Sequence, residues 1–151
     1  MRLMVREATL ADLPSVLGLY AQPEMDQGKA LPLHEAQQVW KQFASYPNYH
    51  LYVACPVNEP DLVWGSYALL IMHNLAHWGT PSAIAEDVVV HPERHRLGIG
   101  RQMMADAMAR SKQAGCYKLV LSSNQKRKNA HAFYESLGFQ RHGYSFLMDL
   151  T

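Results

Sequence analysis

Residues 88–101 read Val88-Val89-Val90-His91-Pro92-Glu93-Arg94-His95-Arg96-Leu97-Gly98-Ile99-Gly100-Arg101, and this stretch decides the fold. An apolar strand stops at Pro92, a basic loop follows, and two glycines open a helix. The first N–H groups of a helix have no internal partner, and the helix dipole favours an anion there. Gly98 and Gly100 let the backbone approach a ligand without a Cβ in the way. The stretch therefore predicts a pyrophosphate site at a strand-to-helix turn.

Two familiar phosphate-binding loops do not fit these glycines. The chain has no Gly-Lys-Ser/Thr here, which excludes a Walker loop. Gly98-Ile99-Gly100-Arg101-Gln102-Met103 lacks the third glycine of the dinucleotide fingerprint. The alternative without a binding role is a flexible loop before a helix. The order of apolar strand, basic loop and glycines argues against that alternative.

Outward from this turn, the apolar periodicity alternates between the strand and helix patterns. Strands are expected at Met4–Ala8, His50–Cys55, Leu62–Met72, Ser82–Val90 and Lys118–Ser122, and as a final pair or one bent strand within Gln140–Leu150. Helices are expected after the N-cap Thr9 (through Leu10, Leu13, Leu17 and Tyr20), at Leu33–Tyr46, at Gly98–Ala114 and at Lys126–Leu137. This order predicts an α/β (α+β) fold, a mixed sheet with helices on its faces, in one domain over residues 1–151.

The charge is unevenly distributed along a nearly neutral chain of net charge +1. Residues 94–128 hold nine Lys or Arg and one acid, Asp106, so this segment carries 9 − 1 = +8. Such a segment favours a focused anion site, with a solvated helix face as the alternative. A nucleic-acid surface fits less well, because the aromatic residues are not interleaved with the cations.

Composition excludes several other classes of protein. Cys55 and Cys116 do not make a disulfide framework and fit a reducing compartment, so we expect a cytoplasmic protein. The longest clean apolar stretch, Ala68–Met72, is far shorter than the roughly 20 residues of a membrane span. His73 and His77 are four residues apart, but no Cys or acid nearby completes a metal site, so we expect no metal.

The turn resembles a family signature. His95-Arg96-Leu97-Gly98-Ile99-Gly100 is similar to the Gln/Arg-x-x-Gly-x-Gly/Ala motif of the GNAT superfamily of acyl-CoA-dependent N-acyltransferases. His95 departs from the usual Gln or Arg, although its ring N–H can still donate to a phosphate. About thirty residues later, Ala130-His131-Ala132-Phe133-Tyr134-Glu135-Ser136-Leu137-Gly138-Phe139 resembles a helix end typical of that family. The two motifs cover residues 82–140 and imply a mostly antiparallel GNAT-like sheet.

The resemblance implies acetyl-CoA as co-substrate. The backbone N–H groups from Arg96 to Arg101 would hold the CoA pyrophosphate, and the strand Val88–Val90 would pair with the pantetheine arm. The residues expected to bind CoA are Val88, Val89, Val90, His95, Arg96, Leu97, Gly98, Ile99, Gly100, Arg101, Arg127 and Asn129.

Tyr134 is the best catalytic candidate. It shares a helix face with Ala130, Phe133 and Leu137, so the alternative is that all four belong to the core. A tyrosine on such a face needs a partner for its hydroxyl. In the family, the matching tyrosine protonates the departing CoA thiolate, and the resemblance implies this role for Tyr134.

The acceptor amine must lose a proton before it attacks, so a base or a water relay is required. Glu86 and Asp87 stand inside an apolar strand, where acids are costly unless they are paired or functional. Strict alternation places Glu86 on the face of Val88 and Val90, and a bulge would scramble that parity. The slot that often holds a glutamate base in the family is occupied by Ile84, so we favour Glu86 weakly over Asp87.

The acceptor is expected at His73-Asn74, on the loop before the cofactor strand. Glucosamine-phosphate acetyltransferases of the family carry a similar His-Asn, and the run Ser122–Ser145 looks like that of aminoalkylphosphonate acetyltransferases. Neither similarity is close enough to name the acceptor.

We therefore predict an N-acetyltransferase that moves an acetyl group from acetyl-CoA directly to a primary amine of a small molecule. No nucleic-acid or membrane partner is expected, and a homodimer is allowed. A rival from another class is a non-catalytic module that holds CoA or acyl-CoA as a sensor, which the isoleucine at 84 and the histidine at 95 favour. A third reading is a nucleic-acid-binding domain that uses the +8 segment.

Overall fold

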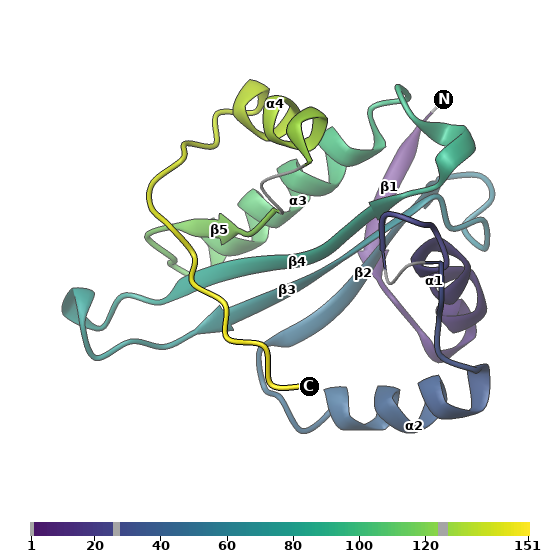
Figure 1. Ribbon diagram of the computed structural model, residues 1–151, viewed down its shortest axis with the longest axis horizontal. Coiled ribbons are helices and arrows are strands. Elements are labelled where there is room, and N and C mark those ends of the chain that lie inside the picture. Colours follow the sequence, from purple (N-terminus) through teal and green to yellow (C-terminus); the bar gives the residue numbers. More distant parts are fainter. Residues whose placement is uncertain (1, 26–27, 124–126) are drawn as a thin grey trace. The chain divides into compact units, whose positions relative to one another are not determined.

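The computed structural model describes residues 2–25, 28–123 and 127–151 (Figure 1). The chain divides into two compact units, residues 1–120 and residues 121–151, and each is considered by itself. The single domain that the sequence predicts stays a prediction.

Five strands form one mixed sheet in the described part of the chain, and their order in space follows the sequence (Figure 1). They are β1 (Leu3–Glu7), β2 (Tyr49–Pro56), β3 (Gly65–Met72), β4 (Ser82–Val90) and β5 (Leu119–Leu121). The pairs β1–β2, β2–β3 and β3–β4 are antiparallel. At the start of β4 the Ala83 N–H donates to the Lys118 carbonyl at 3.0 Å. The predicted strand at Ser82–Val90 is confirmed residue for residue.

The predicted helices are also confirmed, with shifted ends. They are α1 (Leu13–Tyr20), α2 (Leu33–Phe43), α3 (Ile99–Gln113) and α4 (Lys128–Ser136). A 3-10 turn, Leu10–Asp12, precedes α1, and the Thr9 N–H donates to Asp12 Oδ2 at 2.7 Å. Lys126, which was expected to begin the last helix, lies outside the described residues. Within the described ranges, no helix combines the length and apolar character that a bilayer span requires.

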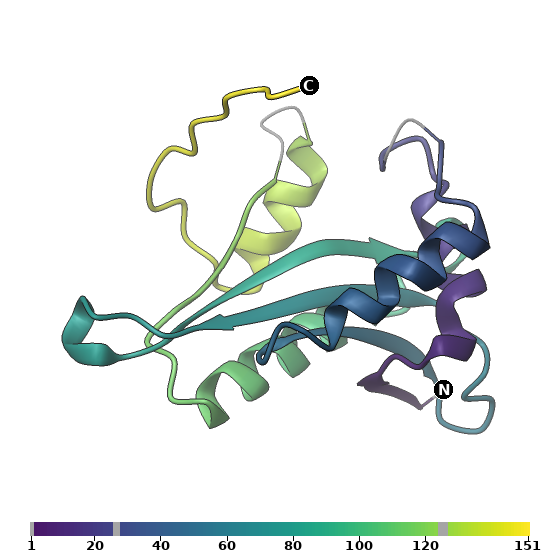
Figure 2. The ribbon, with the colours of Figure 1, turned by 90° about the horizontal axis from the view of Figure 1, so that it is seen from below.

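Helices cover both faces of the sheet within the 1–120 unit, because β3 alternates its side chains between them. Gly65 and Tyr67 face α3, which lies below the strands in Figure 2. Ala68 faces the other way and packs in a core cluster with Val16 and Leu19 of α1. Partly buried aromatic rings of α2 join the edge of the same cluster. One face is therefore closed by α3, and the other is covered by α1 and α2.

The prediction of strands in Gln140–Leu150 is wrong, since the described residues there form no regular element. From Tyr144 to Leu150 every second side chain is large and apolar, which is the pattern of a half-buried strand. Those side chains are instead largely exposed, as Phe146 at 93% illustrates. A strand forms only where a neighbour completes its ladder, and the described residues of the 121–151 unit offer this segment none.

Candidate functional site

The turn between β4 and α3 is open and rich in backbone donors. Gly98 caps α3 with a left-handed φ of +80°, and no described atom lies within 4 Å of the position that a Cβ would take there. The Gln102 N–H donates to the Gly98 carbonyl at 3.0 Å as a regular helical bond. The N–H groups of the first helical turn before it have no acceptor within the helix. The loop residues from Pro92 to Gly98, which lead into this turn, are all exposed.

A close contact with β3 fixes this end of α3. Ile99 and Met103 are buried, and they pack on Gly65 so tightly that a Cβ on Gly65 would lie 2.8 Å from Ile99 Cγ2. The start of the helix is thereby held beside the end of β4. None of the motifs described above includes Gly65, although a glycine inside a strand pattern signals close approach of another element.

The cations of the +8 segment do not form one cluster at this turn. Arg96 and Arg101 are exposed beside it, and Arg94 lies over the Trp64 ring at 4.5 Å. Arg110 sits near the far end of α3, roughly 16 Å along an axis that rises about 1.5 Å per residue. It is paired there with Asp106, Nε to Oδ2 at 2.8 Å. Arg110 therefore does not belong to the anion site that the charge pattern predicts at this turn.

The end of β4 presents backbone groups away from β3. The His91 N–H donates to the Trp64 carbonyl at 2.7 Å, and successive residues of a strand point their backbone groups to opposite sides. The N–H and C=O of Val90 therefore point away from β3. The Gln22 side chain donates to the Val90 carbonyl at 2.9 Å. Gln22 lies just after α1, and no sequence pattern pointed to it.

A β-bulge in β4 decides where Glu86 lies. Ala68 pairs with Glu86 and Ser66 pairs with Val89, so β4 has one extra residue opposite Tyr67. Asp87 takes a left-handed φ of +53°, as one residue of a bulge can. Because Ser66 and Ala68 share a face, so do Glu86 and Val89. The sequence left the face of Glu86 open between strict alternation and a bulge, and the bulge decides it: Glu86 does not share the face of Val88 and Val90.

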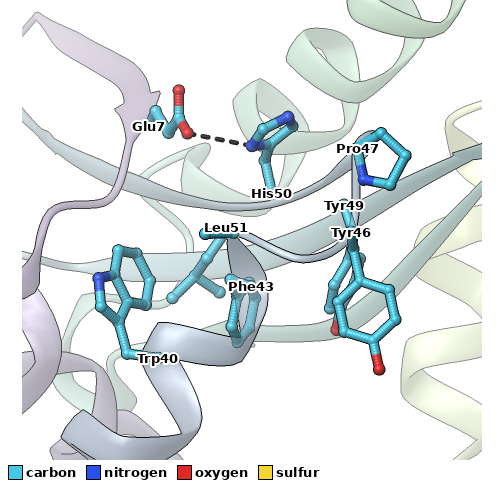
Figure 3. A pocket seen from close by; sticks show the side chains of 9 residues that line it. Glu7, Trp40, Phe43, Tyr46, Pro47, Tyr49, His50 and Leu51 are labelled. Atoms are coloured by element: carbon cyan, nitrogen blue, oxygen red, sulfur yellow. Dashed lines mark ion pairs between the residues drawn. The ribbon is translucent and has the colours of Figure 1, made fainter.

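An aromatic hollow of about 310 Å³ opens where β2 begins (Figure 3). The Phe43 and Tyr49 rings stack at 5.0 Å, Trp40 lies 5.3 Å from Phe43, and Tyr46 meets Tyr49 edge-on at 6.0 Å. The Tyr46 ring is exposed, and the other three rings are half-buried. Figure 3 shows the Glu7–His50 ion pair, Oε1 to Nδ1 at 3.1 Å, across the β2 backbone from these rings.

Burial raises the pKa of Tyr49, and the negative charges of Asp87 and Glu86 raise it further. The Tyr49 hydroxyl at the hollow therefore lies close enough to Asp87 and Glu86 of β4 for their charges to raise its pKa. The sequence predicts Trp40, Phe43 and Tyr46 on a helix and leaves Tyr49 just before a strand, with no functional role for any of them.

His73 and Asn74 lie in the loop that joins β3 to β4. The Asn74 amide donates to the Thr80 carbonyl at 2.7 Å and so closes this loop, while His73 is exposed. Trp78 at the loop's tip has a φ of +61° and is fully exposed. Among the described residues, no group of three His, Cys, Asp or Glu side chains could hold a metal ion.

In the 121–151 unit, Tyr134 lies on α4 and is 9% exposed. Its ring packs 5.4 Å from Phe133 and 5.9 Å from Phe139. Burial raises the pKa of the Tyr134 hydroxyl, and Arg127 partly offsets this, so the group keeps its proton at neutral pH. Arg127 caps α4 and is exposed, as is Asn129.

Comparison with known proteins places these features in a family. Residues 47–141 match the acetyltransferase (GNAT) domain. A glucosamine 6-phosphate N-acetyltransferase of Trypanosoma brucei brucei is 36% identical over 57% of this chain and 56% of its own length. An aminoalkylphosphonate N-acetyltransferase of Salmonella typhimurium is 35% identical over 66% of this chain and 62% of its own length.

A solved structure extends the likeness to nearly the whole chain. A protein of Agrobacterium tumefaciens str. C58 that is assigned as an acetyltransferase has a TM-score of 0.86 and 31% identity, over 97% of this chain and 99% of that protein. Its coverage includes both units, whereas the two curated relatives are matched over little more than half of their own lengths. The chain therefore belongs to the GNAT acetyltransferase family.

Proposed function

We propose that the chain is an acetyl-CoA-dependent N-acetyltransferase that acetylates a primary amine of a small molecule by direct transfer. The observation that carries the proposal is the open turn at Gly98. There the first N–H groups of α3, which have no acceptor within the helix, stand at the end of the loop that leaves β4, and the N–H of Val90 at the end of β4 points away from β3. Pyrophosphate and an extended amide-bearing arm are the two parts of CoA that such groups recognise.

In this proposal the turn binds the pyrophosphate. The backbone from His95 to Arg101, through Arg96, Leu97, Gly98, Ile99 and Gly100, supplies donors, and the side chains of Arg96 and Arg101 supply charge. The strand Val88–Val90 pairs with the pantetheine arm. Arg127 and Asn129 hold the ribose phosphate, so CoA is expected to bind more tightly than dephospho-CoA.

Two side chains move protons. Glu86 takes the proton from the ammonium group of the acceptor, directly or through a water molecule. The free amine then attacks the acetyl carbon, so that a C–N bond forms as the C–S bond breaks. Tyr134 gives its proton to the departing sulfur, and the surplus proton on the new amide nitrogen passes through solvent back to the Tyr134 oxygen. The Tyr134 hydroxyl is protonated at neutral pH, as a general acid must be, and burial, which raises its pKa, keeps it so.

The acceptor, the cellular location and the oligomeric state complete the proposal. The names of the two curated relatives describe acetylation of amines that also carry a phosphate or a phosphonate. His73 and Asn74 remain our proposal for contacts with the acceptor. A cytoplasmic location agrees with the two cysteines, and a homodimer is tested by light scattering on a sizing column.

The decisive experiment uses Tyr134→Phe, which keeps the ring and removes the proton. Single-turnover acetyl transfer to a reactive amine is expected to slow about 10²–10⁴-fold, the usual contribution of a positioned general acid. Affinity for acetyl-CoA, measured by calorimetry, is expected to stay within about twofold. Tyr144→Phe is the matched control, because Tyr144 belongs to the same unit and is 92% exposed.

Three results would contradict the proposal in whole or in part. Full-speed transfer in Tyr134→Phe would remove Tyr134 from the mechanism. Tight acetyl-CoA binding by the parent protein, without thiol release across a broad panel of amines, would favour the sensor module. Strongly salt-dependent RNA binding that CoA does not compete with would favour the nucleic-acid-binding domain.

A further inference from the structure

An apolar floor runs across three strands on the face that α1 and α2 only partly cover. Tyr49 of β2 pairs with Leu70 of β3, and Leu70 pairs with Ile84 of β4, so the three residues share one face. All three are half-buried, whereas Leu51 and Ala68 beside them are buried under the core cluster. The row of Tyr49, Leu70 and Ile84 therefore marks where the core ends and solvent begins. At about 4.8 Å per strand, the row is about 10 Å long.

The two ends of this floor differ in chemistry. At the β2 end stands the aromatic hollow of Trp40, Phe43, Tyr46 and Tyr49. At the β4 end, Glu86 is the next residue on the same face after Ile84, because the bulge begins only beyond Glu86. Glu86 is exposed. The floor thus leads from exposed ring faces and edges to a carboxylate.

The charges that act on the floor are negative. Glu86 on the floor and Asp87 next to it in β4 both raise the pKa of the Tyr49 hydroxyl, whereas Glu7 lies across the β2 backbone in its ion pair with His50. Among the described residues that line the hollow, none is a lysine or an arginine. The faces of aromatic rings also attract cations. A phosphate or phosphonate group would meet repulsion here, and an ammonium group would meet attraction.

We propose that the acceptor is a cationic amine with a flat apolar group, an arylalkylamine in the simplest case, and that it binds along this floor. Its ring lies in the hollow against Tyr46 and Tyr49, and its ammonium group lies toward Glu86. The inference rests on the proposed acetyl transfer and names its substrate class. It also separates this chain from the two curated relatives, whose named substrates carry anionic groups.

Direct binding tests this apart from catalysis. Calorimetry with the full chain, with and without saturating CoA, compares 2-phenylethylamine, 2-phenylethanol and 2-aminoethylphosphonate. We expect 2-phenylethylamine to bind at least about fivefold more tightly than the other two ligands, since only it has both the ring and the cation. Equal or tighter binding of 2-aminoethylphosphonate would overturn the proposal.

Three variants locate the site. Tyr46→Ala removes an exposed ring and is expected to weaken 2-phenylethylamine binding about threefold or more, as the loss of one aromatic pair contact would. Glu86→Gln is expected to weaken binding of the amine but not of 2-phenylethanol. Val39→Ala is the matched control, because Val39 is an exposed apolar residue of the same helix α2 that does not line the hollow. Unchanged amine affinity in Tyr46→Ala would show that the rings are only the outer edge of the core.

Acetyl transfer is then measured with the same ligands. If 2-phenylethylamine binds as expected and no thiol is released from acetyl-CoA, the proposed function fails while the binding site stands. If the anionic amine is acetylated with the higher kcat/KM and 2-phenylethylamine is not, the proposed function stands and the substrate class is wrong.

Discussion

Two aromatic stacks lie on opposite faces of the sheet, and they differ in how far neighbouring side chains bury them. Tyr52 and Tyr67 stack at 5.3 Å on the α3 face, and both are buried. Phe43 and Tyr49 stack at 5.0 Å on the other face, and both are half-buried. The ring geometry is similar in the two stacks, so geometry alone does not tell a structural stack from a binding surface.

The difference comes from what covers each stack. Asp106 of α3 accepts a hydrogen bond from the Tyr67 hydroxyl at 2.6 Å and pairs with Arg110, whose guanidinium lies 4.0 Å over the Tyr52 ring. One ion pair on α3 therefore satisfies the hydroxyl and covers the ring faces. On the other face the next ring is Tyr46, which is exposed. We infer that the closed stack stabilises the fold and that the open stack is left for a ligand.

The largest expected effect comes from opening the closed stack. Asp106→Ala leaves the buried Tyr67 hydroxyl and the Arg110 guanidinium without their shared acceptor. Losing hydrogen bonds to a charged group predicts a loss of about 2–3 kcal/mol in the free energy of unfolding. Urea denaturation measures it, with Asp61→Ala, at an exposed acid, as the control. A loss below about 0.5 kcal/mol, the range of ordinary surface changes, would mean that this ion pair does not hold the stack closed.

The sequence predicted the strand-to-helix turn better than the two stacks. The roles that we propose for Val88–Val90 and Gly98 depend on local backbone chemistry, which a short motif records. The stacks join residues from separate elements, and Glu86 changes face because of one bulged residue. The strand register that brings Tyr49, Leu70 and Ile84 into a row is set by the whole sheet. The failed strands in Gln140–Leu150 teach the same lesson, since alternation predicts a strand but cannot supply its neighbour.

The next effect concerns how closely α3 packs on the closed face. Gly65→Ala would place a Cβ 2.8 Å from Ile99 Cγ2 and 3.1 Å from Met103 Cε. Such overpacking is expected to cost about 1–3 kcal/mol of stability. Gly18→Ala is a sharp control, because no described atom within 4 Å meets the new Cβ in helix α1. That control should raise stability by up to about 1 kcal/mol, since alanine is the better helix former. Equal effects of the two changes would contradict the tight contact.

A third test measures how the stability that Tyr67 gives the closed stack depends on pH. Burial, together with the hydrogen bond to Asp106, raises the pKa of Tyr67 well above that of a free tyrosine. The folded protein then holds this proton where the unfolded chain has lost it. The resulting stability is present in full below the unfolded pKa, about 10, and falls as the pH rises above it. Tyr67→Phe should flatten the loss of stability between about pH 10 and 11, relative to the parent protein. An unchanged slope would show that Tyr67 titrates as it does in the unfolded chain.

The smallest expected effect is the one that most sharply distinguishes the open stack. Tyr46→Ala removes a ring that is 55% exposed and touches Tyr49 only edge-on. Changes of this kind on a surface usually stay within about 0.5 kcal/mol, so the midpoint of urea unfolding should hardly move. If Tyr46→Ala instead lowers the free energy of unfolding by more than about 1 kcal/mol, the ring is part of the core and both stacks stabilise the fold. A near-silent change in stability, measured beside the threefold loss of amine affinity, assigns the exposed ring to binding, because a residue that only stabilised the fold would show the opposite pattern.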